Sequence, residues 1–139
     1  LTFKAKSIGY HPKIILAGRE LNDKMGNYVA SQLITKMKKK FIKIKNAKIL
    51  IMGLTFKPNT DDMRESPAIY ILGELEQAGA QIKAHDPEGM KHAKLVLPSS
   101  ICYCDTMYDV CHQTDVLVLM TEWDIYKSLD FKLIIIIST

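Results

Sequence analysis

Lys48-Ile-Leu-Ile-Met-Gly-Leu-Thr-Phe-Lys-Pro-Asn-Thr-Asp-Asp-Met-Arg-Glu-Ser-Pro67 joins an apolar run to a helix start through a polar loop. The apolar run at 49–52 predicts a buried strand that ends at Gly53. Ser66 is a good N-cap and Pro67 suits the first helical turn. We therefore expect a strand, a loop and a helix N-terminus, in that order.

The loop of this stretch carries two basic residues, Lys57 and Arg64. A loop that leads into a helix N-terminus can present backbone N–H groups to an anion, so a phosphate-bearing ligand suits the pattern. A solvated turn between strand and helix suits it equally, since the motif needs structural context. In that second interpretation Phe56 covers the end of the sheet, and Arg64 pairs with Asp61 or Asp62.

The string Gly53-Leu-Thr-Phe-Lys-Pro-Asn-Thr-Asp-Asp-Met-Arg-Glu-Ser-Pro67 resembles the signature of the C-terminal domain in the UDP-glucose/GDP-mannose dehydrogenase family. Members of that family are NAD-dependent enzymes that oxidise C6 of a nucleotide sugar to a carboxylate. The resemblance implies that Phe56 and Lys57 contact the nucleotide sugar. It also implies that Arg64 meets NAD in the assembled enzyme, while most of the NAD site belongs to an N-terminal domain.

A long helix is predicted upstream, from Pro12 to Lys40. It either packs on its own domain or forms an interface between domains and subunits, and its length favours the interface. Its segment Tyr10-His-Pro-Lys-Ile-Ile-Leu-Ala-Gly-Arg-Glu-Leu-Asn-Asp-Lys-Met25 is similar to the family's interdomain helix, which implies a homodimer. The style is closest to bacterial UDP-N-acetylhexosamine dehydrogenases of surface polysaccharide synthesis. Apolar residues recur every four positions along this helix, at Leu21, Met25, Val29, Leu33 and Met37.

The remainder of the chain alternates predicted strands and helices. This alternation predicts an α/β fold: a Rossmann-like parallel sheet of about five strands with helices on both faces, preceded by the long helix. We expect residues 1–45 to form a helical linker and dimerisation segment. Residues 46–139 are expected to form a UDP-binding domain, truncated at its C-terminal end. The predicted strands span 48–52, 81–85, 101–104, 115–120 and 133–137, and the predicted helices span 67–78, 91–97 and 106–113.

Composition excludes several classes of function. The net charge of +4 comes partly from lysines at 36–45, but no aromatic residues interleave with them as base stacking would need. We therefore expect a solvated helix end and no nucleic-acid partner. No apolar run reaches the roughly 18 residues of a membrane span, and the protein is expected to be cytoplasmic. Three cysteines, Cys102, Cys104 and Cys111, lack the spacing of a metal or redox motif.

Several family features are missing from the sequence. The resemblance implies a cysteine nucleophile in a Gly-Gly-x-Cys motif upstream of Leu1 and an Asp-Gly-Arg motif where 133–139 now stand. Asp86 follows a predicted strand where dinucleotide folds keep a ribose-binding carboxylate. The loop after Gly53, however, lacks the glycines of G-x-G-x-x-G, so an independent NAD site is not expected.

These observations predict the C-terminal part of an NAD-dependent UDP-sugar 6-dehydrogenase of polysaccharide biosynthesis. The fragment alone is expected to be inactive: it contributes substrate binding through Phe56 and Lys57, a contact to NAD through Arg64, and dimerisation. It is expected to contain no catalytic residue and no metal site. The alternative is a non-catalytic nucleotide-binding or dimerisation module with the same fold.

Overall fold

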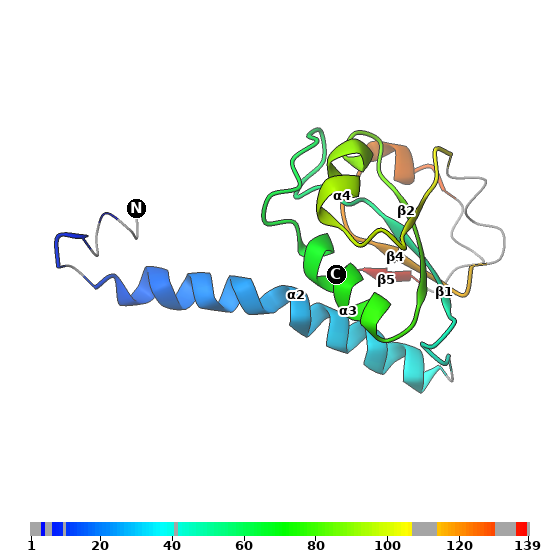
Figure 1. The fold of residues 1–139 in the computed structure, drawn as a ribbon, viewed down its shortest axis with the longest axis horizontal. Coiled ribbons are helices and arrows are strands. Elements are labelled where there is room, and N and C mark those ends of the chain that lie inside the picture. Colours follow the sequence, from blue (N-terminus) through cyan, green and yellow to red (C-terminus); the bar gives the residue numbers. More distant parts are fainter. Residues whose placement is uncertain are drawn as a thin grey trace.

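The computed structural model describes residues 4, 7–9, 11–40, 42–106, 114–129 and 136–138, with the backbone alone given at 22, 23 and 136–138. Five parallel strands form one sheet in the order β3-β2-β1-β4-β5, as the alternating pattern predicts (Figure 1). The strands are β1 (Lys48–Met52), β2 (Gln81–His85), β3 (Cys102–Tyr103), β4 (Val116–Leu119) and β5 (Ile136–Ser138). The helices are α2 (Lys13–Lys39), α3 (Pro67–Gln77), α4 (Met90–Val96) and the 3-10 helix η1 (Asp124–Tyr126).

The strand order creates a switch point beside β1. The chain proceeds outward from β1 to β2 and β3, and then returns to place β4 on the other side of β1. Successive connections therefore diverge between β1 and β4. In open α/β sheets, ligands bind beyond the carboxyl ends of the strands at such a point.

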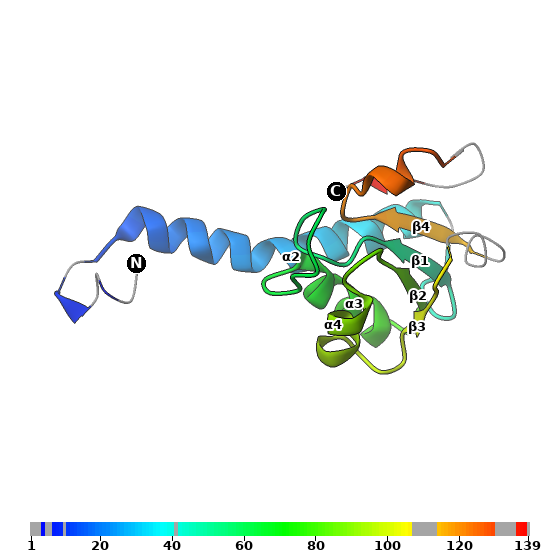
Figure 2. The ribbon, with the colours of Figure 1, turned by 90° about the horizontal axis from the view of Figure 1, so that it is seen from above.

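The two faces of the sheet are covered differently. The alternation of side chains along β1 sends Ile49 and Ile51 into a core shared with α2, α3 and α4. Leu50 and Met52 point to the other face, where they pack with residues of η1 and its approach. Figure 2 shows α3 and α4 on one side of the sheet and the orange η1 segment on the other. The helix predicted at 106–113 falls almost entirely at 107–113, outside the described residues.

Helix α2 is divided between two environments. In its C-terminal half, Ala30, Leu33 and Met37 are buried in the core against α3. Its N-terminal half extends away from the sheet, and there Leu21 is 63% exposed and Met25 is 44% exposed (Figure 1). The predicted apolar stripe of α2 therefore has two parts: its C-terminal part packs on the chain's own domain, and its N-terminal part is exposed to solvent.

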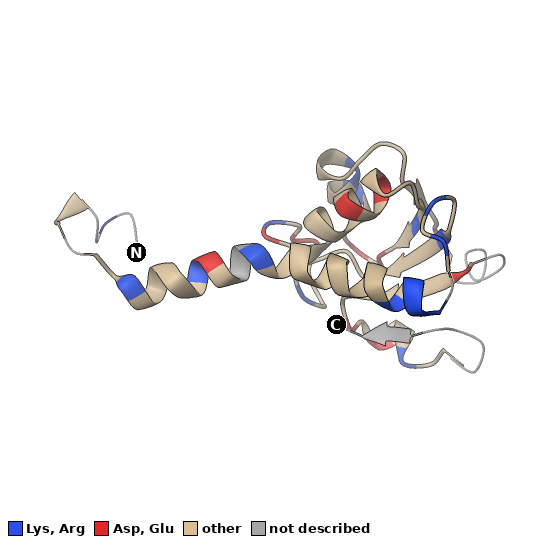
Figure 3. Cartoon of the chain, turned by 90° about the horizontal axis from the view of Figure 1, so that it is seen from below, with Lys and Arg blue, Asp and Glu red and all other residues tan. Residues whose placement is uncertain are grey.

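Helices α2 and α3 meet closely at Gly26. A Cβ at this position would lie 2.7 Å from the Cβ of Tyr70, which is closer than real side chains approach. The glycine therefore permits the two helices to approach closely. The described lysines at 36–45 are exposed, as predicted for a solvated helix end. They lie in the last turns of α2 and in the segment that follows it (Figure 3).

Both ends of α3 follow the local sequence signals. The Ser66 Oγ accepts from the N–H of Ala68 at 3.2 Å, and Pro67 occupies the first helical position. After Gln77 the chain turns at Gly79, whose φ of +86° is favourable for glycine alone. Ser66 also donates its hydroxyl to the carbonyl of Leu54 at 2.5 Å, so the helix start is tied to the end of β1.

Candidate functional site

A cavity of about 490 Å³ lies at the carboxyl ends of β1 and β4, at the switch point of the sheet. Its first wall is residues 56–59 of the loop that follows β1. Its second wall comes from the segment that follows β4 and includes residues 119–122, 124 and 127. The structure therefore places Phe56 and Lys57, two of the predicted site residues, in one cavity.

The two walls touch at the base of the cavity. Gly53 has a φ of +83°, and a Cβ there would lie 2.6 Å from the backbone nitrogen of Thr121. The Thr121 hydroxyl donates to the carbonyl of Thr55 at 2.6 Å. These contacts hold the loop directly against the end of β4, which only a residue without a side chain at position 53 allows.

Phe56 and Lys57 offer their side chains to solvent at this site. Phe56 is 55% exposed, although its backbone N–H is fixed by the carbonyl of Asp62 at 2.9 Å. Lys57 is exposed and forms no ion pair within the described part of the chain. On the opposite wall Lys127 is paired with Asp124 at 2.6 Å. An ammonium that takes part in none of the described ion pairs and lies beside an exposed aromatic ring can hold an anion attached to a planar group.

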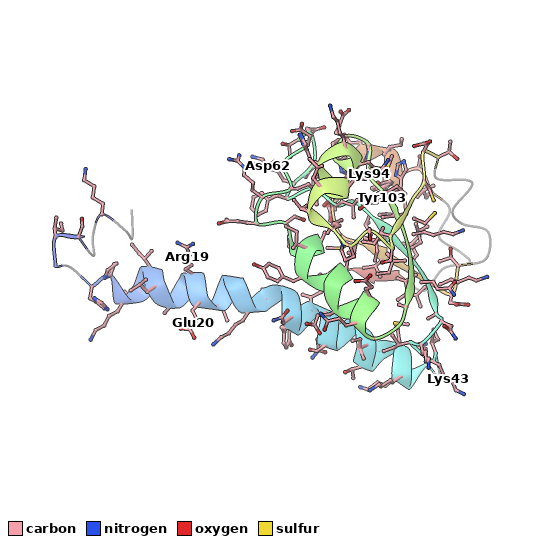
Figure 4. The ribbon with its side chains drawn as sticks, in the orientation of Figure 1. Arg19, Glu20, Lys43, Asp62, Lys94 and Tyr103 are labelled. Atoms are coloured by element: carbon pink, nitrogen blue, oxygen red, sulfur yellow. The ribbon has the colours of Figure 1, made fainter. Side chains whose placement is uncertain are left out.

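Arg64 lies on a different side of the same loop. It lines a second cavity of about 500 Å³, between residues 60–64 and α4. Its guanidinium donates to both carboxylate oxygens of Asp62, at 3.0 and 2.8 Å, and Figure 4 shows Asp62 at the outer edge of the loop. Hydrogen bonds from the Arg64 side chain and backbone lower the pKa of Asp62 to about 2. Of the two partners that the sequence allowed for Arg64, the structure selects Asp62.

His92 of α4 fastens the outer part of this loop. Its Nδ1 lies 3.1 Å from the backbone oxygen of Asp61 and 3.2 Å from a carboxylate oxygen of the same residue. The contact spans 31 positions of the chain. Sequence reasoning did not single out His92, and its position on a short helix gave no signal of this contact.

Asp86 occupies the centre of the site region, although it does not line the cavity. It is 1% exposed, and its Oδ2 accepts from the backbone N–H of Leu54 at 2.7 Å and of Thr55 at 3.2 Å. The same oxygen lies 3.2 Å from the indole nitrogen of Trp123. The first N–H groups of the loop are therefore directed at an internal carboxylate. These two N–H groups are therefore not available to an external anion, a role that the sequence pattern left open beside that of a solvated turn.

His85 is a buried packing residue that contacts η1. Its Nδ1 lies 2.9 Å from the hydroxyl of Tyr126, and that hydroxyl donates to the carbonyl of His85 at 3.0 Å. The Tyr126 hydroxyl thus contacts both the ring and the backbone carbonyl of the same histidine. Burial lowers the pKa of His85, which favours the neutral imidazole.

The sequence profile for the UDP-glucose/GDP-mannose dehydrogenase family, UDP binding domain, matches residues 50–136. This range contains the last three residues of β1, the loop with Phe56 and Lys57, and both walls of the cavity. The chain belongs to this family.

Individual relatives agree with the family profile. A UDP-N-acetyl-D-glucosamine 6-dehydrogenase of Pseudomonas aeruginosa is 53% identical over 87 residues, which are 63% of this chain and 21% of that protein. A UDP-glucose 6-dehydrogenase of Bacillus subtilis is 36% identical over 126 residues, which are 91% of this chain and 26% of that protein. The chain therefore spans about a quarter or less of the length of these curated relatives.

A solved structure extends the match to the long helix. A UDP-glucose dehydrogenase from the hyperthermophilic archaeon Pyrobaculum islandicum is similar with a TM-score of 0.84 and 28% sequence identity. The match covers 99% of this chain and 31% of that one. The similarity therefore includes helix α2 as well as the sheet domain.

The described residues of this UDP-binding domain contain no group of three or more His, Cys, Asp or Glu side chains arranged to hold a metal. Cys102 is exposed and Cys104 is half-buried, while Cys111 lies outside the described residues. In the part of the chain that the structure describes, no helix is long and apolar enough to cross a membrane.

Proposed function

We propose that this chain is the nucleotide-sugar-binding part of an NAD-dependent UDP-sugar 6-dehydrogenase. The cavity beside Phe56 and Lys57 holds the UDP-sugar, whose C6 the whole enzyme oxidises to a carboxylate in polysaccharide biosynthesis. One observation carries the proposal: an exposed lysine outside the described ion pairs and an exposed aromatic ring share a cavity at the switch point of the family's UDP-binding domain. The names of the relatives support the same substrate class.

Within this proposal Lys57 neutralises the diphosphate as a point charge, and Phe56 contacts the nucleotide sugar. The free position of Lys57 supports this role, because a lysine already paired with a carboxylate would have to exchange partners. The contrast with Lys127 supports it further, since Lys127 lies in the same cavity but is paired with Asp124.

Arg64 contacts NAD from the second cavity. Its side chain is 89% exposed and its guanidinium suits a phosphate, so the residues present fit a dinucleotide approaching from outside the domain. When bound, NAD supplies the hydride acceptor of the reaction. Arg64 binds and orients it there, and Asp62 holds the guanidinium in place. Because the two cavities lie on different sides of one loop, substrate and cofactor reach it without competing.

The open half of α2 pairs with a second copy of the chain in a homodimer. Its exposed apolar side chains support this, because an extended helix with large apolar residues facing solvent lacks a partner. The C-terminal half is already covered by the chain's own domain. It therefore packs within the domain, and the N-terminal half forms the contact between subunits. The exposed apolar residues of the open half include Ile14, Ile15, Leu21, Met25 and Tyr28.

Binding of UDP to the 139-residue chain tests the substrate site. Calorimetry should detect UDP binding, and Lys57→Ala should weaken it by about tenfold or more, because a charge-assisted contact contributes about 1.5–3 kcal/mol. Uridine, which lacks the diphosphate, should be affected far less. Lys43→Ala is the matched control, since Lys43 is also exposed but precedes β1 at the opposite edge of the sheet (Figure 4).

An equal affinity of Lys57→Ala and the parent chain for UDP would refute the assignment of Lys57. In the whole enzyme, Lys57→Ala should raise the KM for the UDP-sugar, whereas Arg64→Ala should impair the use of NAD. A whole protein that binds UDP but forms no NADH with any nucleotide sugar would favour the alternative, a non-catalytic nucleotide-binding module.

A further inference from the structure

We propose that Asp86 is the positioning residue of the UDP cavity: one buried carboxylate fixes both cavity walls and is thereby closed to ligands. The inference deepens the proposed function and rests on it for the identity of the ligand. Asp86 comes from a third segment, the turn between β2 and α4, and does not line the cavity. It acts on the substrate through the residues that it holds.

The first wall is fixed where it leaves β1. Asp86 Oδ2 accepts from the backbone N–H groups of Leu54 and Thr55 and lies 3.3 Å from the Thr55 hydroxyl. Thr55 immediately precedes Phe56 and Lys57, so these contacts determine where the ligand-facing part of the loop begins. The Thr55 hydroxyl also reaches the carbonyl of Lys57 at 3.2 Å, which connects Asp86 to the proposed diphosphate contact.

The second wall is fixed by the same oxygen. The indole N–H of Trp123 donates to Asp86 Oδ2 at 3.2 Å, and Trp123 lies between Glu122 and Asp124, which both line the cavity. The two walls are separated by more than 60 positions in sequence, as the 66-position contact between Thr121 and Thr55 illustrates. Asp86 therefore joins them from behind, at a depth that solvent does not reach.

The other carboxylate oxygen anchors Asp86 to its own turn. Oδ1 accepts from the backbone N–H groups of Glu88 at 3.0 Å and Gly89 at 2.7 Å. A Cβ at position 89 would collide with the methyl group of Thr55, so glycine lets this turn pack against the first wall. The carboxylate is thus held on one side by its own turn and on the other by the two walls.

This arrangement leaves Asp86 unable to serve a ribose. Both oxygens already accept hydrogen bonds from groups of the chain, and the side chain is 1% exposed. A carboxylate at this position binds a ribose hydroxyl in dinucleotide-binding folds. Here the carboxylate at the same position instead accepts hydrogen bonds from the loop after β1. Asp86 therefore stabilises the wall of the neighbouring cavity and does not bind a ligand itself.

Asp86→Asn tests the inference in the 139-residue chain. An amide has one acceptor oxygen, so its NH₂ group faces N–H donors in either orientation, and at least one set of contacts is lost. The matched control is Asp115→Asn, because Asp115 also accepts a backbone N–H, that of Lys48 at 2.8 Å, but at the opposite edge of the sheet. Trp123→Phe is a milder variant that keeps an aromatic ring and removes the indole donor alone.

Two readouts are compared at a temperature where each variant is folded. Asp86→Asn should change amide chemical shifts on both walls, at 54–59 and at 121–127, and should raise the Kd for UDP about tenfold. Asp115→Asn should do neither. If Asp86→Asn does not fold, Trp123→Phe decides: it should shift the amides of both walls and weaken UDP binding to a smaller extent.

A lower melting temperature with an unchanged Kd and shifts confined to 86–90 would overturn the inference, since Asp86 would then contribute to stability alone. If Asp86→Asn does not fold, unchanged amide shifts at 54–59 in Trp123→Phe would overturn the inference. If the parent chain does not bind UDP, the proposed function fails for this chain, and the amide shifts of the two walls still decide the role of Asp86.

Discussion

Gly53→Ala should destabilise the domain more than any glycine change at a comparable backbone angle. Gly53 has a φ of +83°, and a non-glycine residue in this region is disfavoured by about 1–2 kcal/mol. A Cβ there would also lie 2.6 Å from the Thr121 nitrogen and 2.7 Å from its oxygen, and overpacking of this kind adds about 1–3 kcal/mol. We expect a total loss of about 2–5 kcal/mol in the free energy of unfolding.

Gly79→Ala is the matched control for this change. Gly79 has a φ of +86°, but the nearest atom to its added Cβ would be the Lys45 Cγ at 3.4 Å, an ordinary contact. Both variants share the backbone penalty and the effect of alanine on the unfolded chain. Urea denaturation of the two variants therefore isolates the contact with Thr121. If Gly53→Ala is no less stable than Gly79→Ala, the close contact between the cavity walls is not as the structure describes.

Two further predictions concern assembly and charge. Leu21→Glu should convert the proposed dimer to a monomer in sedimentation velocity, because a charge would be buried in the interface. Lys24→Glu on the same helix should leave the dimer intact. A parent chain that sediments as a monomer contradicts the proposal. Asp62 should titrate near pH 2 by NMR, against an ordinary value of 3.8, and its pKa should return toward 3.8 in Arg64→Ala. Since the folded-state pKa is lowered, the stabilisation from this pair is complete above pH 3.8 and is lost as the pH falls through about 2; high salt should weaken it because the pair is exposed. An unshifted Asp62 would contradict the bidentate pair.

The sequence predicts most of the fold because local signals agree with one another. Strands β1 and β2 have the predicted bounds, and the Ser66 cap and the Gly79 turn occur where local chemistry favours them. The third strand is shorter than predicted, since it pairs with β2 at Lys83 and Ala84 alone, at the edge of the sheet. Periodicity gave the right helix for α2, but it does not specify which part of a stripe meets its own domain.

The site is less accessible to sequence reasoning because its contacts connect distant segments. The family resemblance brought forward Phe56, Lys57 and Arg64, but it does not specify that Arg64 lines a different cavity from the other two. The role of Asp86 depends on donors 32 and 37 positions away, which no local pattern encodes. The position of Asp86 directly after a predicted strand was the available signal, and it pointed to a ribose rather than to the two walls.

Titration of the isotope-labelled chain with UDP, followed through its amide chemical shifts, tests the central claim most directly. It locates the ligand among the cavities of the described residues without assuming which residue binds it. The largest changes should occur at 56–59 and 119–127, around Lys57, and they should vanish in Lys57→Ala while persisting in Lys43→Ala. Changes centred instead on 60–64 and α4, or at the amino edge of the sheet near Lys48, would contradict it.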